Sequence, residues 1–117
     1  MMRASAEPGE RGCGMWAQMI SVRLKAGREG DLHQLEEQIR KAEQPGSGLI
    51  RSLVMEDQKD PSRVHMLVVF ESEEHARARE SDPRRQEALQ PARELMGEIF
   101  DGPPEFVDLA VVEETTL

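Results

Sequence analysis

The run Arg63–Phe70 constrains the fold more than any other segment of this 117-residue chain. Its sequence is RVHMLVVF, and polar turn residues bound it on both sides. Its length and its β-branched residues favour a strand over a helix. From Met66 onward every residue of this run is apolar, so both faces of the strand carry apolar side chains. This pattern is typical of a strand that is covered on both faces. We therefore expect a central strand with helices on one side and a second layer on the other.

Three further strands and an amphipathic helix are expected along the chain. Residues 16–24 alternate between the two faces of a strand, with the larger apolar side chains on one of them. Residues 28–43 repeat leucine and isoleucine at steps of three and four, which predicts a helix with one buried face. Residues 49–55 and 106–112 are short apolar segments that follow turns rich in glycine and proline, and we expect a strand at each.

A broken helix is expected between the third and fourth strands. Ser72 suits an N-cap, and Asp82-Pro83 combines a second capping residue with proline at the first helical position. Apolar residues then recur at helical spacing along residues 84–100. Pro91 lies off this apolar face and removes one backbone hydrogen bond, so it should kink or split the helix.

The order strand, helix, strand, strand, broken helix, strand predicts an α+β fold of the ferredoxin-like type. Connection rules favour a split βαβ arrangement, with a four-stranded antiparallel sheet and the helices on one face. Because these helices cannot cover the second apolar face of the sheet, we expect a homodimer whose partner sheet covers it. The domain should span residues 15–113, between a flexible N-terminal tail at 1–14 and a C-terminal tail at 114–117.

The composition disfavours several classes of partner. The chain has 15 basic and 23 acidic residues and a net charge of −8, which disfavours binding to nucleic acid and to anionic membranes. No apolar stretch has the length of a membrane span. The single cysteine, Cys13, has no disulfide partner within the chain, which fits a reducing compartment. We therefore expect a cytoplasmic protein without membrane or nucleic-acid partners.

Polar side chains within the predicted strands are candidates for a ligand site. Gln18 stands on the more apolar face of the first strand, where it is either satisfied by its neighbours or aimed into a cavity. Arg51 shares a predicted face with Leu49, and its head either extends to the sheet rim or holds an anion. Met66 and Met96 fall within predicted elements, where methionine either fills the core or lines an adaptable pocket.

The later helical region is locally basic. Its spacing predicts a solvated surface on which arginines pair with neighbouring glutamates, and the alternative is a gate for an anionic substrate. The histidines and the cysteine show no spacing typical of a metal site. The arginines concerned are Arg77, Arg79, Arg84, Arg85 and Arg93.

The layout of residues 15–113 resembles the antibiotic biosynthesis monooxygenase domain. The similarity lies in the order of elements and in the turn residues between them, and no single motif carries it. Members of that family are dimeric α+β barrels, and several oxidise phenols or quinols with oxygen and without a bound cofactor, while others degrade haem. The matching segments are the strand 16–24, Gly27-Arg28-Glu29, Pro45-Gly46, residues 68–74, Asp82-Pro83 and Gly102-Pro103-Pro104.

The chain departs from the family pattern at three positions. Active members often have a tryptophan directly after the third strand, where this chain has Ser72-Glu73. They often have an asparagine on the first strand, where Gln18 and Ser21 are the nearest polar residues. Arg84 stands where many relatives have a histidine, so no iron ligand is carried over and haem binding is disfavoured.

The resemblance implies a cofactor-independent monooxygenase that acts on a small aromatic or quinol-like substrate. His65 or His75 would then be the catalytic base, because the pKa of a histidine lies near neutrality. The alternatives for His65 are a structural hydrogen bond or a place in the dimer interface, and for His75 a solvated position. The alternative function is a non-catalytic dimeric binding module. The residues expected to contact the substrate are Trp16, Gln18, Arg51, Met66 and Met96.

Overall fold

A computed structural model describes residues 14–117 of the chain. Its sheet is antiparallel and has four strands in the order β2-β3-β1-β4, so that β1 and β3 are central. This arrangement confirms the predicted ferredoxin-like α+β fold. The predicted tail at residues 1–14 lies outside the described residues, apart from Gly14. The strands are β1 (Trp16–Arg23), β2 (Leu49–Glu56), β3 (Arg63–Phe70) and β4 (Glu105–Ala110).

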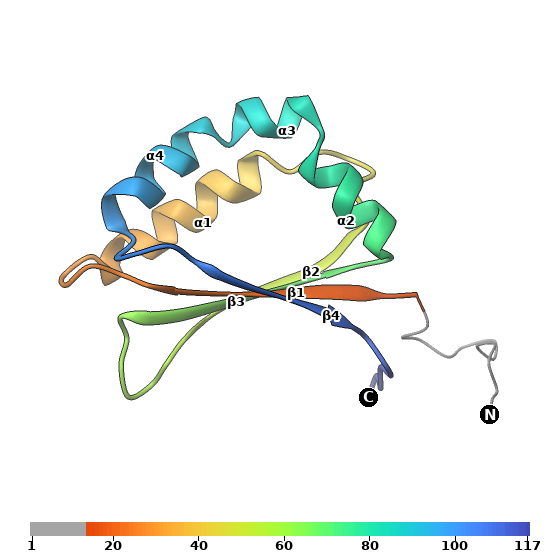
Figure 1. The fold of residues 1–117 in the computed structure, drawn as a ribbon, viewed down its shortest axis with the longest axis horizontal. Helices are drawn as coiled ribbons and strands as arrows, with labels where there is room; N and C mark the ends of the chain where they lie inside the picture. The colour runs from red at the N-terminus through yellow and green to blue at the C-terminus, as the bar shows by residue number, and fades with distance from the viewer. Residues whose placement is uncertain (1–13) are drawn as a thin grey trace.

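The helices cover one face of the sheet and leave the other face open (Figure 1). The first long helix contacts the last one along the middle of this layer, and the second helix lies over one end of the sheet. No helix among residues 14–117 combines the length and the apolar character that crossing a membrane requires. The helical elements are η1 (Glu29–Asp31), α1 (Leu32–Lys41), α2 (Glu73–Glu80), α3 (Pro83–Ala88) and α4 (Gln90–Ile99).

The first helix is shorter than the predicted range 28–43. Arg28 has φ −103° and ψ 11°, which lies outside the helical region, so the chain enters through the single 3-10 turn η1. The Nε atom of Arg28 lies 2.5 Å from Oδ2 of Asp31 and holds this turn. The regular helix therefore begins only at Leu32.

The capping residues of the later helices are where the sequence predicts them. The Oγ atom of Ser72 accepts a hydrogen bond of 3.1 Å from the backbone N–H of His75, which starts α2. The carboxylate of Asp82 accepts one of 2.9 Å from the backbone N–H of Arg84, which starts α3. Both bonds satisfy donors that a helix leaves unpaired at its N-terminus.

The predicted helix 84–100 is split into two. The break falls at Leu89, between α3 and α4, and Pro91 occupies the first turn of α4. Proline has no N–H to donate within a continuous helix, but it is well tolerated in a first turn, where that donor has no partner. The split therefore relieves the conflict that the sequence contains.

The core lies between the helices and the central strands. Its largest fully buried side chains are Leu24, Leu35, Val64 and Ile99, each at most 2% exposed. A second, smaller cluster at the other end of the sheet contains Trp16, Phe70 and Ala76. The larger cluster also includes Val22, Ala42, Met66, Leu89, Ala92 and Leu95.

The face of the sheet away from the helices is apolar and open. Because side chains alternate along a strand and Met66 faces the helices, its neighbours His65 and Leu67 point to this open face. The register places side chains of both edge strands beside them. Large apolar residues on this face are substantially exposed: Leu53 (42%), Met55 (37%), Val107 (51%) and Leu109 (38%).

A β-bulge near the start of β2 changes one predicted face. Leu49 pairs with Phe70 and Arg51 pairs with Val69, so the extra residue Ile50 has no separate partner. Strict alternation predicts Leu49 and Arg51 on one face, but the bulge places them on opposite faces. Leu49 consequently packs with Phe70 under the helices, and Arg51 belongs to the open face.

Gly48, directly before β2, offers a test of the local backbone. Its φ is +82°, and an added Cβ would lie 2.5 Å from ring atoms of His75 and 2.6 Å from its Cβ. Gly46 has a similar φ of +79° but has nothing within 4 Å of such a Cβ. We expect Gly46→Ala to cost about 1 kcal/mol of unfolding free energy through backbone strain alone. Gly48→Ala should cost roughly 1–3 kcal/mol more, because His75 must also move.

Urea unfolding of both variants measures this difference. Equal midpoints for the two alanine variants would contradict the close contact between Gly48 and His75.

Candidate functional site

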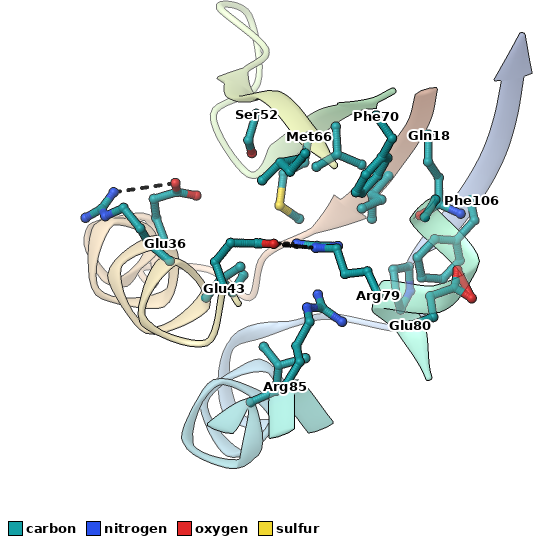
Figure 2. Close-up of a pocket in the computed structure, with 18 of the residues that line it drawn as sticks. Gln18, Glu36, Glu43, Ser52, Met66, Phe70, Arg79, Glu80, Arg85 and Phe106 are labelled. Carbon is teal, nitrogen blue, oxygen red and sulfur yellow. Dashed lines mark hydrogen bonds and ion pairs between the residues drawn. The ribbon is translucent and has the colours of Figure 1, made fainter. Parts of the chain in front are cut away.

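A cavity of about 740 Å³ lies between the sheet and the helical layer. It is large enough for a ligand of several rings, and its walls are mainly apolar. Figure 2 shows Glu43, Arg79 and Arg85 reaching into it from the helical side and Met66 facing it from the sheet. Its apolar wall includes Trp16, Ile20, Met66, Phe70, Met96 and Phe106.

Two arginines of α2 lie over aromatic rings at one end of this cavity. The guanidinium carbon of Arg77 is 4.8 Å from the ring centroid of Trp16, and that of Arg79 is 5.1 Å from the centroid of Phe70. The two rings are 6.2 Å apart and inclined at 42°. Each cation is attracted by the negative face of its ring, which holds α2 against the ends of β1 and β3.

Glu43 and Arg79 form an ion pair beside the cavity (Figure 2). Nη2 of Arg79 lies 2.8 Å from Oε1 of Glu43, and its Nε lies 3.0 Å from Oε2. The side chains are 10% and 23% exposed for Arg79 and Glu43, so solvent screens the pair little. Burial by itself would raise the pKa of Glu43, but hydrogen bonds from Arg79 and Ser47 and the charge of Arg79 hold it below its ordinary value.

Arg85 is the second cation of the inner wall. Its side chain rises from α3 toward the Glu43–Arg79 pair (Figure 2). Its Nε is buried and has no hydrogen-bond partner among the described residues. Burial and the neighbouring charge of Arg79 lower the pKa of Arg85 to about 10.

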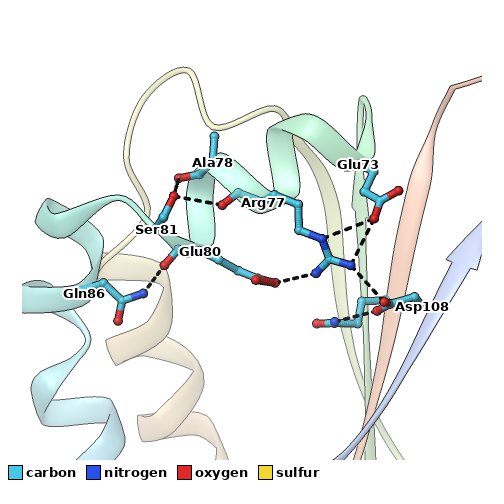
Figure 3. A network of polar contacts seen from close by, with 8 residues as sticks. Glu73, Arg77, Ala78, Glu80, Ser81, Gln86 and Asp108 are labelled. Atoms are coloured by element: carbon cyan, nitrogen blue, oxygen red, sulfur yellow. Dashed lines mark hydrogen bonds and ion pairs between the residues drawn. The ribbon is translucent and has the colours of Figure 1, made fainter.

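A polar network closes the rim next to Trp16. Arg77 reaches from α2 to β4 and donates to Oδ2 of Asp108 at 3.0 Å, as Figure 3 shows. The amide nitrogen of Gln18 donates to Oδ1 of the same carboxylate at 3.0 Å. These two hydrogen bonds lower the pKa of Asp108. Arg77 also binds Glu73 and Glu80 of its own helix, as the sequence predicts for this arginine.

Four of the predicted substrate-contacting residues meet at the cavity. Trp16 and Gln18 of β1 line it together with Met66 of β3 and Met96 of α4. Gln18 was expected either to be satisfied by its neighbours or to face a cavity, and both hold: its amide has a partner in Asp108, and its side chain lines the cavity. Contact with a substrate stays a prediction for all four.

His65, His75 and Arg51 do not line this cavity. His65 lies on the open face of the sheet, where its Nδ1 is 2.8 Å from Oγ of Ser21. His75 lies in the first turn of α2, with its Nδ1 2.7 Å from Oγ of Ser72. Their catalytic roles stay predictions, and the two histidines are not brought together in one site.

Nothing in the sequence marks Glu43 as a site residue, and the spacing of Arg79 and Arg85 predicts a solvated surface for both arginines. The structure instead turns both arginines inward, because a guanidinium on a long side chain can reach past the helix edge into a cavity. The one sequence feature that pointed to these two arginines was the high density of arginines in this region of an acidic chain. Among residues 14–117, no group of three His, Cys, Asp or Glu side chains could hold a metal ion.

The Glu43–Arg79 pair predicts a pH-dependent stability. Since the pKa of Glu43 is lowered on folding, the pair stabilises the fold above about pH 4.5, the ordinary value for this group, and less as the pH falls through the folded pKa. We expect Arg79→Met to lower the free energy of unfolding by about 2 kcal/mol at pH 7, which is less than the loss on breaking a fully buried ion pair. The loss should shrink in acid.

Urea unfolding of the wild type and Arg79→Met at pH 7 and pH 3 tests this expectation. Arg40→Met is the control, because Arg40 pairs with Glu36 at 3.7 Å with its own side chain 60% exposed, and such pairs contribute about 0.5 kcal/mol or less. An Arg79→Met effect as small as the control effect would contradict the role assigned to the pair.

Comparison with known proteins places the fold. No protein-family model matches the sequence, and a comparison with curated proteins finds no match. Solved structures with the same fold include a "putative antibiotic biosynthesis monooxygenase" from Bordetella bronchiseptica, at 25% identity and a TM-score of 0.66, covering 89% of this chain and 99% of that one. Another, of the same description, comes from Chloroflexus aurantiacus, at 23% identity and a TM-score of 0.63, covering 88% and 98%.

A third structure with this fold is SnoaB, a cofactor-independent oxygenase from Streptomyces nogalater. It is 11% identical, with a TM-score of 0.67, and the similarity covers 89% of this chain and 97% of that one. The chain therefore has the fold of the antibiotic biosynthesis monooxygenase structures over nearly their whole length.

Proposed function

We propose that this chain is a monooxygenase of the antibiotic biosynthesis type that oxidises a small aromatic or quinol-like substrate with oxygen and without a cofactor. The observation that carries this proposal is the cavity of about 740 Å³, walled by aromatic and apolar side chains, within a fold that it shares with a cofactor-independent oxygenase. A largely apolar cavity with a few polar groups is the usual form of a small-molecule site.

The cavity offers distinct surfaces to such a substrate. Trp16 and Phe70 present tilted aromatic rings, and Met66 presents an adaptable thioether beside them. Gln18 and Arg85 supply polar groups at separate points of the wall. For an anthrone, the ring methylene is oxidised to a carbonyl: one oxygen atom of O₂ enters the substrate, and the other leaves as water with the two methylene hydrogens.

Oxygen uptake by the purified protein tests the proposed activity. A panel of anthrones, quinols and catechols is incubated with chelator-treated protein, and oxygen uptake and product are followed together. We expect at least one substrate to be consumed with one O₂ per molecule of product.

A variant that obstructs the cavity checks where the reaction occurs. Ser52 lines the cavity yet is exposed, so Ser52→Trp should obstruct it with little effect on the core. We expect turnover to fall at least about tenfold. Gln58→Trp, in the exposed loop after β2, is the matched control and should retain turnover. Equal activity of the two variants would place the reaction outside this cavity.

The histidine assignments have a separate test. Since His65 and His75 lie outside the cavity, a reaction within it should survive His65→Ala and His75→Ala with kcat nearly unchanged. A large loss of kcat in His65→Ala, with the unfolding curve preserved, would move the chemistry to the open face of the sheet. Retained turnover in both variants would remove the histidines as candidate bases.

A non-catalytic binding module of the same fold is the second candidate. It is favoured by Ser72-Glu73 at the position where active relatives often have tryptophan, and by the absence of both histidines from the cavity wall. Calorimetric binding of the same aromatic compounds without oxygen uptake would support this candidate over the enzyme.

We also propose that the chain forms a homodimer through the open face of the sheet. The exposed Leu53, Met55, Val107 and Leu109 lie together there, and a monomer would leave this apolar surface in water. A second sheet packed against it would bury both copies of the patch around a two-fold axis.

Light scattering measures the assembly directly. We expect a mass of twice 13.2 kDa at micromolar concentration, and a monomer for Leu53→Glu, because two copies of a buried unpaired carboxylate oppose association. Lys59→Glu, in the exposed loop after β2, is the control and should stay dimeric. A monomeric wild type would overturn the proposal.

A further inference from the structure

Arg85 is a half-buried cation that the protein leaves without a counterion. Its Nε is buried and unpaired, and no ion pair within residues 14–117 includes its guanidinium. The side chain belongs to the cavity wall and points toward the Glu43–Arg79 pair (Figure 2). A buried donor without a partner costs free energy, and more so when it carries a charge.

The carboxylates around the cavity are already engaged. Both oxygens of Glu43 accept hydrogen bonds from Arg79. Glu80 pairs with Arg77 at 3.0 Å, and Glu36 faces Arg40 at 3.7 Å. Arg85 is therefore the one guanidinium of the inner wall, among the described residues, that has no carboxylate paired with it.

The electrostatics of the wall agree with a guanidinium that has no paired carboxylate. Burial lowers the pKa of Arg85 first, and repulsion from Arg79 and Arg93 lowers it further, against the attraction of Glu43 and Glu80. An anion placed next to the guanidinium of Arg85 would pair with its charge and reduce the repulsion between the arginines.

The wall opposite Arg85 is apolar. The cavity is lined there by Met66, Val68 and Phe70 of β3. A ligand that fits both surfaces has an apolar ring body and one anionic oxygen at its edge. The fork of the guanidinium suits a carboxylate or a phenolate.

We propose that Arg85 is an anion-binding residue of the cavity, so that the ligand is an aromatic or alicyclic molecule bound as its carboxylate or phenolate. The proposal rests on the proposed function only in using the same cavity. It names the charge of the ligand and requires no turnover, so binding measurements test it independently of oxygen chemistry.

Isothermal titration calorimetry of 1-naphthoate against 1-naphthamide at pH 7 tests the preference for an anion. The two molecules have the same rings and differ in the charge of one substituent. We expect the wild type to bind 1-naphthoate at least about tenfold more tightly than 1-naphthamide, because one charge-assisted hydrogen bond contributes about that much affinity. Arg85→Gln should bind the two compounds equally, and Arg85→Lys should restore part of the preference.

Arg84→Gln is the matched control, since Arg84 is the adjacent residue of α3, carries the same charge and is 66% exposed on its side chain. It should keep the wild-type preference. Absent binding of naphthoate to the wild type, equal binding of the two compounds, or an undiminished preference in Arg85→Gln would each overturn the proposal. Unfolding curves of the three variants establish that each is folded.

The phenolate form has its own measurement. The absorbance of 4-nitrophenol reports its ionisation, and binding next to Arg85 should shift that ionisation to lower pH in the wild type but not in Arg85→Gln. A shift supports phenolates as ligands, and its absence together with a preference for naphthoate assigns the site to carboxylates. Failure of every oxygen-uptake experiment would leave these binding results intact, and equal binding would leave the oxygenase proposal standing.

Discussion

The ion pair between Glu43 and Arg79 is the contact on which the cavity depends. Glu43 follows α1 and Arg79 belongs to α2, so their hydrogen bonds join two parts of the helical layer that are 36 residues apart. The pair connects these segments through two long side chains, which hold them together without filling the space over the sheet. A purely apolar contact at this place would need bulk, and bulk would reduce the cavity. The rings of Trp16 and Phe70, each beneath an arginine of α2, fix the same helix from the other side.

The sheet separates the cavity from the open apolar face, because side chains alternate between its two faces along each strand. Side chains of β1 and β3 that face the helices build the cavity, and those between them build the open apolar face. Met66 and His65 are neighbours in sequence, yet the first lines the cavity and the second bonds to Ser21 on the far side. A substitution in a central strand therefore affects either the proposed ligand or the proposed partner, according to whether its position is even or odd.

The fold was predictable because its signals are local. The apolar run of β3, the caps Ser72 and Asp82 and the break before Pro91 each follow from residues a few positions apart. The cavity was predictable only in part: Trp16, Gln18, Met66 and Met96 stand out as large or polar side chains within regular elements. Glu43, Arg79 and Arg85 do not, because a charged residue near a helix end has the same sequence pattern whether it faces water or a cavity. Only the long-range approach of α2 to the end of α1 distinguishes the two.

The bulge between Leu49 and Arg51 has a consequence for how such proteins diverge. β2 is an edge strand, so an inserted or deleted residue there shifts the strand without breaking a central ladder. One such event would exchange which side chain faces the cavity and which faces the outer surface of the sheet. Ligand preference and assembly could thus change in a single evolutionary step, and the sequence identity around the bulge would reveal little of it.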